Sequence, residues 1–240
     1  MNSATTIKIP AYLRVAIILT LVNLAILGIR NLYVGERFFD FLQSNLFIGS
    51  FPTIVIAWLI DMNYKKMGWL LFWFAVTLWV LFYPNAPYMI SDLIHNSESP
   101  ASKNDPDLIV YDTLIIFSFA MLSVFIGFLS LKVIFRILLE KYRKPFAKAF
   151  IAFTLALSCL GFYMGRELPS HLPKVGNGKL YSWEIFLEPV EVIKIVWQAI
   201  WPPQDHIPAY LLMALFGAVQ YMLLIMFKDV NDVEDITHIS

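Results

Sequence analysis

Repeated apolar runs of about the length that crosses a bilayer are the feature that most constrains this chain. A helix needs about 20 mainly apolar residues to cross the hydrocarbon core of a membrane. Six stretches approach or reach that length, roughly 11–29, 45–62, 67–82, 108–131, 146–165 and 209–227. Only 15% of the 240 residues are charged, against about 25% in soluble domains. The sequence therefore predicts an all-α integral membrane protein with about six transmembrane helices, in a single polytopic membrane domain covering residues 1–240.

The segment 181–201 does not fit a simple count of six spans. Its polar residues form one stripe along an otherwise apolar helical pattern: Glu184, Glu188, Glu191, Lys194 and Gln198. These charges favour a helix that lies at the membrane interface or packs inside the bundle. A crossing here would instead give seven spans and move the carboxyl terminus to the other side.

Lysine and arginine residues indicate how the chain is oriented. The densest basic cluster follows the fourth expected span and comprises Lys132, Arg136, Lys141, Arg143, Lys144 and Lys148. Positive residues accumulate in cytoplasmic loops, so this cluster is expected in the cytoplasm. Lys65 and Lys66, in the turn between spans two and three, fall on the same side. An even number of spans then places both termini in the cytoplasm.

The stretch YPNAPYMISDLIHN, residues 83–96, follows the third apolar run directly. Pro84 and Pro87 make continuation of a regular span unfavourable, and Asn85 is expected to cap a new short helix. The helical period predicts an interfacial amphipathic helix over about 86–96, on the outer face. One polar stripe on it holds Tyr88, Ser91, Asp92 and His95.

Other chemically capable residues are assigned to the same outer face. Asp112 lies in an apolar segment, where a carboxylate is costly unless it faces the bundle or water. Tyr163 and Arg166 end the fifth span, and Trp183 follows. The hypothesis is a polar site with Asp92 and His95 as catalytic residues and with these binding residues: Asn85, Tyr88, Asp112, Tyr163, Arg166 and Trp183.

Several cofactors and ligands are disfavoured by the pattern of residues. Haem is disfavoured because no histidine lies within an apolar run, and nucleotide because no phosphate-binding glycine loop is present. The formal net charge of zero gives no indication of nucleic acid binding. A divalent metal stays open, with only two or three plausible ligands together. A transporter is disfavoured because the main polar residues deep in the spans, Asn23 and Gln220, cannot ionise.

The same residues carry a resemblance to a known family. The segments FYPNAPYMISDLIHN, VYDTLIIFSFAMLSVFIGFLSL, GFYMGREL and SWEIF together resemble the bacterial membrane-protein family of unknown function numbered 1361. The resemblance implies a small multi-span protein of the bacterial inner membrane and supplies no activity. Its motif residues fall on Asn85, Pro87, Tyr88, Asp92, His95, Tyr111, Asp112, Gly165, Arg166 and Trp183. The loop after Arg166 is longer here than in the family, which leaves His171 without a counterpart.

Three interpretations of function remain open from the sequence. The favoured one is an accessory or scaffold protein whose outer polar cluster holds helix ends together and whose outer helix docks another membrane protein. The alternative is a membrane-embedded enzyme or a binding protein for a lipid head group or another anion. In it, Asp92 and His95 transfer protons or bind a metal, Asp112 orients His95, and Arg166 binds the anion. A transporter of a small solute is the third.

Overall fold

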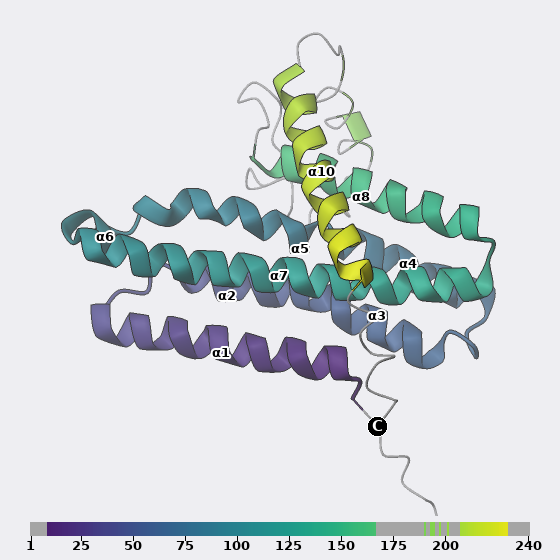
Figure 1. Ribbon diagram of the computed structural model, residues 1–240, viewed down its shortest axis with the longest axis horizontal. Coiled ribbons are helices and arrows are strands. Elements are labelled where there is room, and N and C mark those ends of the chain that lie inside the picture. Colours follow the sequence, from purple (N-terminus) through teal and green to yellow (C-terminus); the bar gives the residue numbers. More distant parts are fainter. Residues whose placement is uncertain are drawn as a thin grey trace, which may run out of the picture. The chain divides into compact units, whose positions relative to one another are not determined.

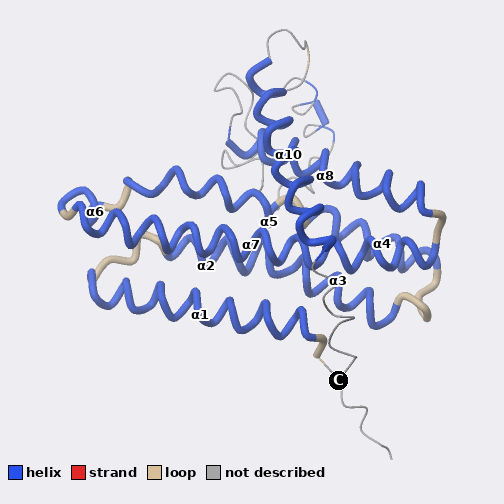
Figure 2. Tube along the Cα trace, viewed as in Figure 1, coloured by secondary structure: helices blue, strands red, loops and turns tan. Residues whose placement is uncertain are grey.

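The protein is all-helical within the residues that the computed structural model describes, which are 9–166, 190, 193–194, 197, 201 and 207–229 (Figures 1 and 2). Five helices in those ranges are long and apolar enough to cross a membrane. This confirms the predicted all-α membrane fold. The chain divides into two compact units, Met1–Ile151 and Ala152–Ser240, here unit 1 and unit 2.

Unit 1 is organised around its longest helix, α7 (Pro106–Lys141), and Figure 1 shows α1 lying lengthwise beside it. The other elements of the unit are α1 (Ala11–Val34), α2 (Asp40–Asn45), the π-helix η1 (Leu46–Ser50), α3 (Phe51–Asn63), α4 (Trp69–Phe82), α5 (Asn85–Tyr88), the 3₁₀ helix η2 (Met89–Ser97) and α6 (Pro100–Asn104). Helix α8 (Lys144–Arg166) begins in unit 1 and continues into unit 2. The main core cluster lies among these helices and includes Leu27, Phe39, Leu42, Leu46, Ile54, Met89, Ile116, Phe119 and Ile126.

The helices overlap all six predicted spans but several extend further. The second membrane-length helix runs over Asp40–Asn63, because α2, η1 and α3 follow one another without a break. Helix α7 continues about ten residues past the predicted end of the fourth span. The sixth predicted span lies in α10 (Ile207–Asp229), in which Met213–Met222 is a shorter apolar stretch. A count of six spans therefore stays a prediction.

The end of α1 is set by Gly35. Its φ of 72° lies in the left-handed region, which glycine adopts without the steric penalty that a Cβ brings. The Gly35 N–H donates to the carbonyl of Asn31 at 2.9 Å, closing the last turn. The chain can then reverse direction into Glu36 and on to α2, so α1 and the second membrane-length helix form a hairpin.

The π-helix at Leu46–Ser50 lies directly before Pro52 in α3. Proline lacks the N–H that would bond to the carbonyl four residues earlier, and its ring clashes with that carbonyl. A wider π-turn at this point relieves the conflict and leaves the chain helical on both sides. The proline that the sequence places in the second span is therefore accommodated by a change in helix type.

The stretch 83–97 is helical, but its helix type differs from the α-helical expectation. Four α-helical residues at Asn85–Tyr88 lead into nine residues of 3₁₀ helix. With three residues per turn, the predicted stripe splits into two rows, one holding Asp92 and His95 and the other holding Tyr88 and Ser91. Asn85 does not cap the helix: its Nδ2 donates back to the carbonyl of Phe82 at 3.2 Å.

The burial of the residues in this stretch also differs from the burial expected for a helix whose polar face lies in water. Ser91 and Asp92 are buried, while Ile94 is 60% exposed. The polar residues face the packed helices because η2 lies against α7. The polar residues of the predicted stripe therefore lie in two neighbouring rows, and Ser91 and Asp92 face the other helices rather than water.

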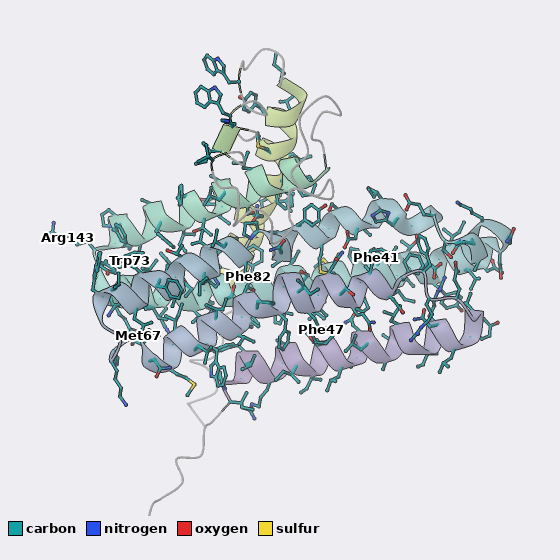
Figure 3. The ribbon with its side chains drawn as sticks, turned by 180° about the vertical axis from the view of Figure 1, so that it is seen from behind. Phe41, Phe47, Met67, Trp73, Phe82 and Arg143 are labelled. Carbon is teal, nitrogen blue, oxygen red and sulfur yellow. The ribbon has the colours of Figure 1, made fainter. Side chains whose placement is uncertain are left out.

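The end of unit 1 opposite to α6 carries most of its basic residues. Figure 3 shows Trp73 and Arg143 together at this end, with Phe41 toward the other end. Arg136 on α7 pairs with Asp61 on α3, and the Tyr64 hydroxyl donates to Glu140. The predicted basic cluster thus lies partly on the last turns of α7, where it ties α3 to α7.

Unit 2 contains a pair of helices joined through polar and aromatic contacts. Ser158 on α8 donates to Oε1 of Gln220 on α10 at 2.8 Å, and the Gln220 amide lies 3.5 Å from Sγ of Cys159. Phe162 stacks on Phe216 with ring centroids 4.3 Å apart. Gln220 and Ser158 are buried, so their hydrogen bond satisfies two polar groups inside an apolar pair. The expected helix over 181–201 lies outside the described residues, apart from single positions.

Candidate functional site

A buried arginine on α1 and a buried aspartate on α7 form the centre of the polar region. Arg30 is 6% exposed and Asp112 is 0% exposed. The guanidinium donates from Nε to Oδ1 at 3.0 Å and from Nη2 to Oδ2 at 3.1 Å. This two-point contact is the geometry in which arginine binds a carboxylate most strongly. It joins the end of α1 to the beginning of α7.

Three more side chains complete what we call the Arg30 cluster: Glu36, Ser99 and Ser102. Arg30 Nη1 donates to the Glu36 carbonyl at 3.0 Å, and Nη2 lies 3.3 Å from the Glu36 carboxylate. Nη2 also approaches Ser99 Oγ at 3.1 Å. Ser102 donates its hydroxyl to Asp112, and Ser99 donates to Glu36 at 2.8 Å. The cluster thus gathers one positive and two negative charges.

The sequence brings these residues together through helix starts and ends. Ser99 caps α6 by accepting from the Ser102 N–H at 3.4 Å. Asp105 caps α7 by accepting from the Asp107 N–H at 3.1 Å. The capped starts of α6 and α7 therefore fold the segment before α7 back over the end of α1. The Phe39 ring covers the guanidinium of Arg30, with Cζ 4.8 Å from the ring centroid, and shields the cluster on that side.

Asp92, a predicted catalytic residue, lies in a second polar contact between helices. Its Oδ2 accepts from Nδ2 of Asn45, at the end of α2, at 3.0 Å. Asp92 is 2% exposed, so its carboxylate is enclosed by packed helices rather than open to water. Asn45 is the last residue of α2 and immediately precedes the π-helix.

His95, the other predicted catalytic residue, pairs with Glu98. Nδ1 of the imidazole lies 2.6 Å from Oε2 of Glu98, and the His95 side chain is 29% exposed. The His95 ring meets the edge of Phe41 at 5.3 Å between centroids. A carboxylate at Nδ1 fixes the ring's orientation, as it does for histidines that transfer protons. The described carboxylate partner of His95 is therefore Glu98, while the described partners of Asp112 are Arg30 and Ser102.

The NAPY residues are positioned by close approach to two glycines. A Cβ added at Gly127 of α7 would lie 2.8 Å from Cβ of Ala86, and one at Gly49 would lie 3.0 Å from Cβ of Asn85. Glycine lets the backbones approach at such points in a membrane bundle. The Ser123 hydroxyl stabilises this contact by donating a hydrogen bond to the carbonyl of Ala86 at 2.7 Å. Asn85, predicted as a binding residue, is thus held against η1.

The remaining predicted binding residues are placed less completely. Tyr88 ends α5 and is half-buried, and its carbonyl accepts from Ser91 Oγ at 2.6 Å. Tyr163 and Arg166 belong to the last turns of α8, but only their backbone is described. Trp183 and His171 lie outside the described residues. The predicted gathering of Arg166 with Asp92, His95 and Asp112 stays a prediction.

The part of the chain that the structure describes contains no group of side chains that could serve as the ligands of a metal ion. No three of the histidine, cysteine, aspartate and glutamate side chains in these residues come together in a way that could hold an ion. Among the described contacts, Asp92 accepts from the Asn45 amide and His95 pairs with the Glu98 carboxylate. The geometry of the described residues therefore points to hydrogen bonding and ion pairing between helices.

Sequence reasoning missed Arg30, Glu98 and Asn45. Arg30 directly follows the first predicted span, a position at which a charged residue is usual and gives no sign of a buried partner. One signal was available: a buried carboxylate such as Asp112 requires a cationic or hydrogen-bonding partner, and Arg30 lies at the same end of the bundle. The bond between Asn45 and Asp92 had no such signal, because residue periodicity does not show which separate helices pack together.

Comparison with known proteins gives one match. The sequence profile of a protein family described as "Protein of unknown function (DUF1361)" matches residues 44–223. This range contains the NAPY stretch, Asp92, His95 and Asp112, while Arg30 lies before it. No curated protein and no solved structure matches the chain.

Proposed function

The chain belongs to the family of proteins of unknown function DUF1361, and because that family brings no activity, we propose a role from the geometry alone. The protein is a multi-pass membrane protein. We propose that it is an accessory or scaffold protein of the bacterial inner membrane, in which the Arg30 cluster and the Asp92–Asn45 contact fix the helix ends. The surface so fixed positions another membrane protein.

The dense pairing of buried charges in the Arg30 cluster is the observation that carries this proposal. All three guanidinium nitrogens of Arg30 donate to acceptors, and both Asp112 oxygens accept from donors. Groups that are buried and already paired cannot bind a substrate without breaking those bonds, which costs several kcal/mol for a buried ion pair, roughly 3–5. The cluster therefore suits a structural role, in which it fixes the ends of α1, α6 and α7.

Complementation in a strain that lacks the gene tests this role. Loss of a scaffold lowers the amount or the assembly of particular membrane proteins, measured by quantitative proteomics of the membrane fraction and by blue-native gels. Wild-type chain and a His95→Gln variant should both restore those proteins, because no proton transfer is needed. An unchanged membrane proteome in the deletion strain would contradict the scaffold role.

A membrane-embedded proton-transfer enzyme is the second candidate, favoured by the pair His95–Glu98. The imidazole is partly exposed and a carboxylate at Nδ1 holds its orientation, an arrangement that suits a histidine that transfers protons. In the same complementation, a His95→Gln variant present at wild-type level but unable to restore the phenotype would favour this enzyme over the scaffold.

The proposed orientation places the Arg30 cluster outside and both termini in the cytoplasm. The basic residues at the other end of unit 1 support it through the positive-inside rule. Two exposed lysines provide a matched test, Lys103 on α6 and Lys66 before α4. In a Cys159→Ala background, an impermeant maleimide added to whole cells should label the Lys103→Cys variant and not the Lys66→Cys variant. The reverse pattern would overturn the orientation.

A further inference from the structure

A half-open groove lies between the last turns of α1 and the beginning of α2. Its volume is about 480 Å³, within the range of about 300–1,000 Å³ typical of small-molecule sites. Its apolar wall includes Leu24, Leu27 and Gly28. A Cβ added at Gly28 would meet no atom within 4 Å, so the glycine leaves open space beside the helix. None of the residues proposed for function above lines this groove.

The polar mouth of the groove is formed by Asn31, Arg37 and Asp40. Nδ2 of Asn31 donates to Oδ1 of Asp40 at 2.7 Å, and Nε of Arg37 lies 3.3 Å from Oδ2 of Asp40. The Arg37 side chain is 83% exposed. Oδ1 of Asn31 is buried and accepts no hydrogen bond from any described residue. The mouth therefore offers a ligand an accessible cation, Arg37, and a partly exposed carboxylate, Asp40.

The order of these residues along the chain makes the groove apolar at one end and polar at the other. Leu24, Leu27 and Gly28 belong to a membrane-length apolar helix, whereas Arg37 and Asp40 follow its end at Gly35. A ligand that fills the groove must have an apolar chain beside the leucines and a polar group at the helix end. A phospholipid has this arrangement.

Charge complementarity selects the head group. A phosphodiester matches the exposed Arg37 guanidinium, and a primary ammonium supplies N–H donors for the partly exposed Asp40 carboxylate. A choline head group has no N–H to donate, and an anionic glycerol head group would lie beside the Asp40 carboxylate without a cation. We propose that this groove binds one phospholipid with a zwitterionic, primary-amine head group, such as phosphatidylethanolamine.

Native mass spectrometry of the delipidated full chain tests the proposal. Dioleoyl phosphatidylethanolamine, phosphatidylcholine and phosphatidylglycerol are titrated separately into protein held in the same detergent. One ethanolamine lipid should bind about tenfold more tightly than either of the others, the size expected for a lost polar contact of about 1.4 kcal/mol. Equal affinities for the three lipids would mean unspecific contact with the apolar surface and would overturn the proposal.

Substitutions locate the binding to this groove. Gly28→Phe fills the open space and should reduce ethanolamine-lipid binding by about tenfold or more. Val22→Phe adds the same ring to an exposed position of α1 that does not line the groove and should leave binding unchanged. Thermal unfolding in detergent should be similar for both variants. Equal binding by the Gly28→Phe variant and the wild type would overturn the site.

The head-group contacts are tested by two polar variants. Asp40→Asn keeps an acceptor for Asn31 but removes the negative charge, so the preference for ethanolamine over choline should disappear. Arg37→Gln should weaken the binding of all three lipids to a similar degree, because each carries a phosphate. Glycerophosphoethanolamine, which lacks the acyl chains, should not displace the bound lipid; displacement at equal concentration would show that the apolar wall makes no contribution and would contradict the proposed lipid.

Discussion

Arg30 and Asp112 are 82 positions apart in the sequence, yet their side chains meet through two hydrogen bonds of 3.0 and 3.1 Å. One residue comes from the end of the first membrane-length helix and the other from the beginning of the longest helix. Neither residue can be solvated by water where it lies, so each is the main reason that the other is tolerated there. Their pairing fixes the relative position of α1 and α7.

Removing one partner of this pair should be far more damaging than removing both. Asp112→Leu leaves a buried guanidinium without its main carboxylate, and we expect a loss of about 3–5 kcal/mol in the free energy of unfolding. Adding Arg30→Met should recover a large part of that loss. The measurement is a double-mutant cycle of reversible unfolding in mixed micelles.

The pair Arg136–Asp61 provides the control for this cycle. It is partly exposed, and exposed ion pairs contribute about 0–1 kcal/mol. Asp61→Asn should therefore have a small effect. Similar losses for Asp61→Asn and Asp112→Leu would contradict a special role for burial.

Gly127 should not tolerate even a methyl group. Its Cβ would lie 2.8 Å from Cβ of Ala86, and overpacking of this kind costs about 1–3 kcal/mol. Gly127→Ala should therefore lower the melting temperature, and adding Ala86→Gly should restore part of it. Gly28→Ala is the control, since nothing lies within 4 Å of that position. A Gly127→Ala variant as stable as Gly28→Ala would show that α5 and α7 are not in close contact.

Tyr64 should lose its phenolic proton at a higher pH than an ordinary tyrosine. Its hydrogen bond to Glu140, aided by the negative charge of that carboxylate, raises the pKa of the Tyr64 phenol. A raised pKa means that this contact stabilises the fold fully below about pH 10, the ordinary pKa of tyrosine. The stabilisation is lost as the pH rises through the higher pKa of the folded state.

An absorbance difference titration at alkaline pH measures this shift. The curve of the Tyr64→Phe variant is subtracted from that of the wild type, so that the remaining signal belongs to Tyr64. Replacing Glu140 by glutamine should move the Tyr64 transition back toward lower pH. A Tyr64 transition that is the same with and without the Glu140 carboxylate would refute the contact.

Ser158 and Gln220 should be energetically coupled. Polar contacts between membrane helices contribute about 0.6 kcal/mol on average and rarely exceed about 1.7 kcal/mol. A double-mutant cycle with Ser158→Ala and Gln220→Leu should give a coupling in that range. The exposed Tyr221 on α10 provides a control: Ser158→Ala and Tyr221→Phe should show additive effects. Zero coupling between Ser158 and Gln220 would contradict the described pairing of α8 with α10.

The sequence predicted the helical membrane fold because the length and spacing of apolar runs depend on bilayer thickness alone. It also indicated that Asp112 cannot face lipid. It did not identify Arg30 as its partner, because periodicity within one helix carries no information about which distant helix will pack beside it. Pairing of that kind depends on the hairpin at Gly35 and on the capped turns at Ser99 and Asp105, which bring separate helix ends together.

The stretch around Asp92 shows a second limit of sequence reasoning. The residues themselves pointed to a helix with Asp92 and His95 on one side, and both residues do lie in one row. The change from α-helix to 3₁₀ helix was not predicted, because the pattern of apolar residues separates helix from strand and does not select between types of helix. Whether these residues perform chemistry stays a prediction for the complementation experiments to decide.

The length of α7 has a consequence for the membrane in which the protein is found. Its 36 residues extend about 54 Å at about 1.5 Å per residue, and a tilt of about 40° is the most that spanning helices usually adopt. Even at that tilt, α7 extends further along the membrane normal than the thickness of a hydrocarbon core, which is about 30 Å. Its ends must therefore project beyond the lipid tails. Between Asp112 and Lys132 no residue can ionise, and this interval is about 30 Å long. We therefore expect the hydrocarbon core to cover the part of α7 between the Arg30–Asp112 pair and Lys132.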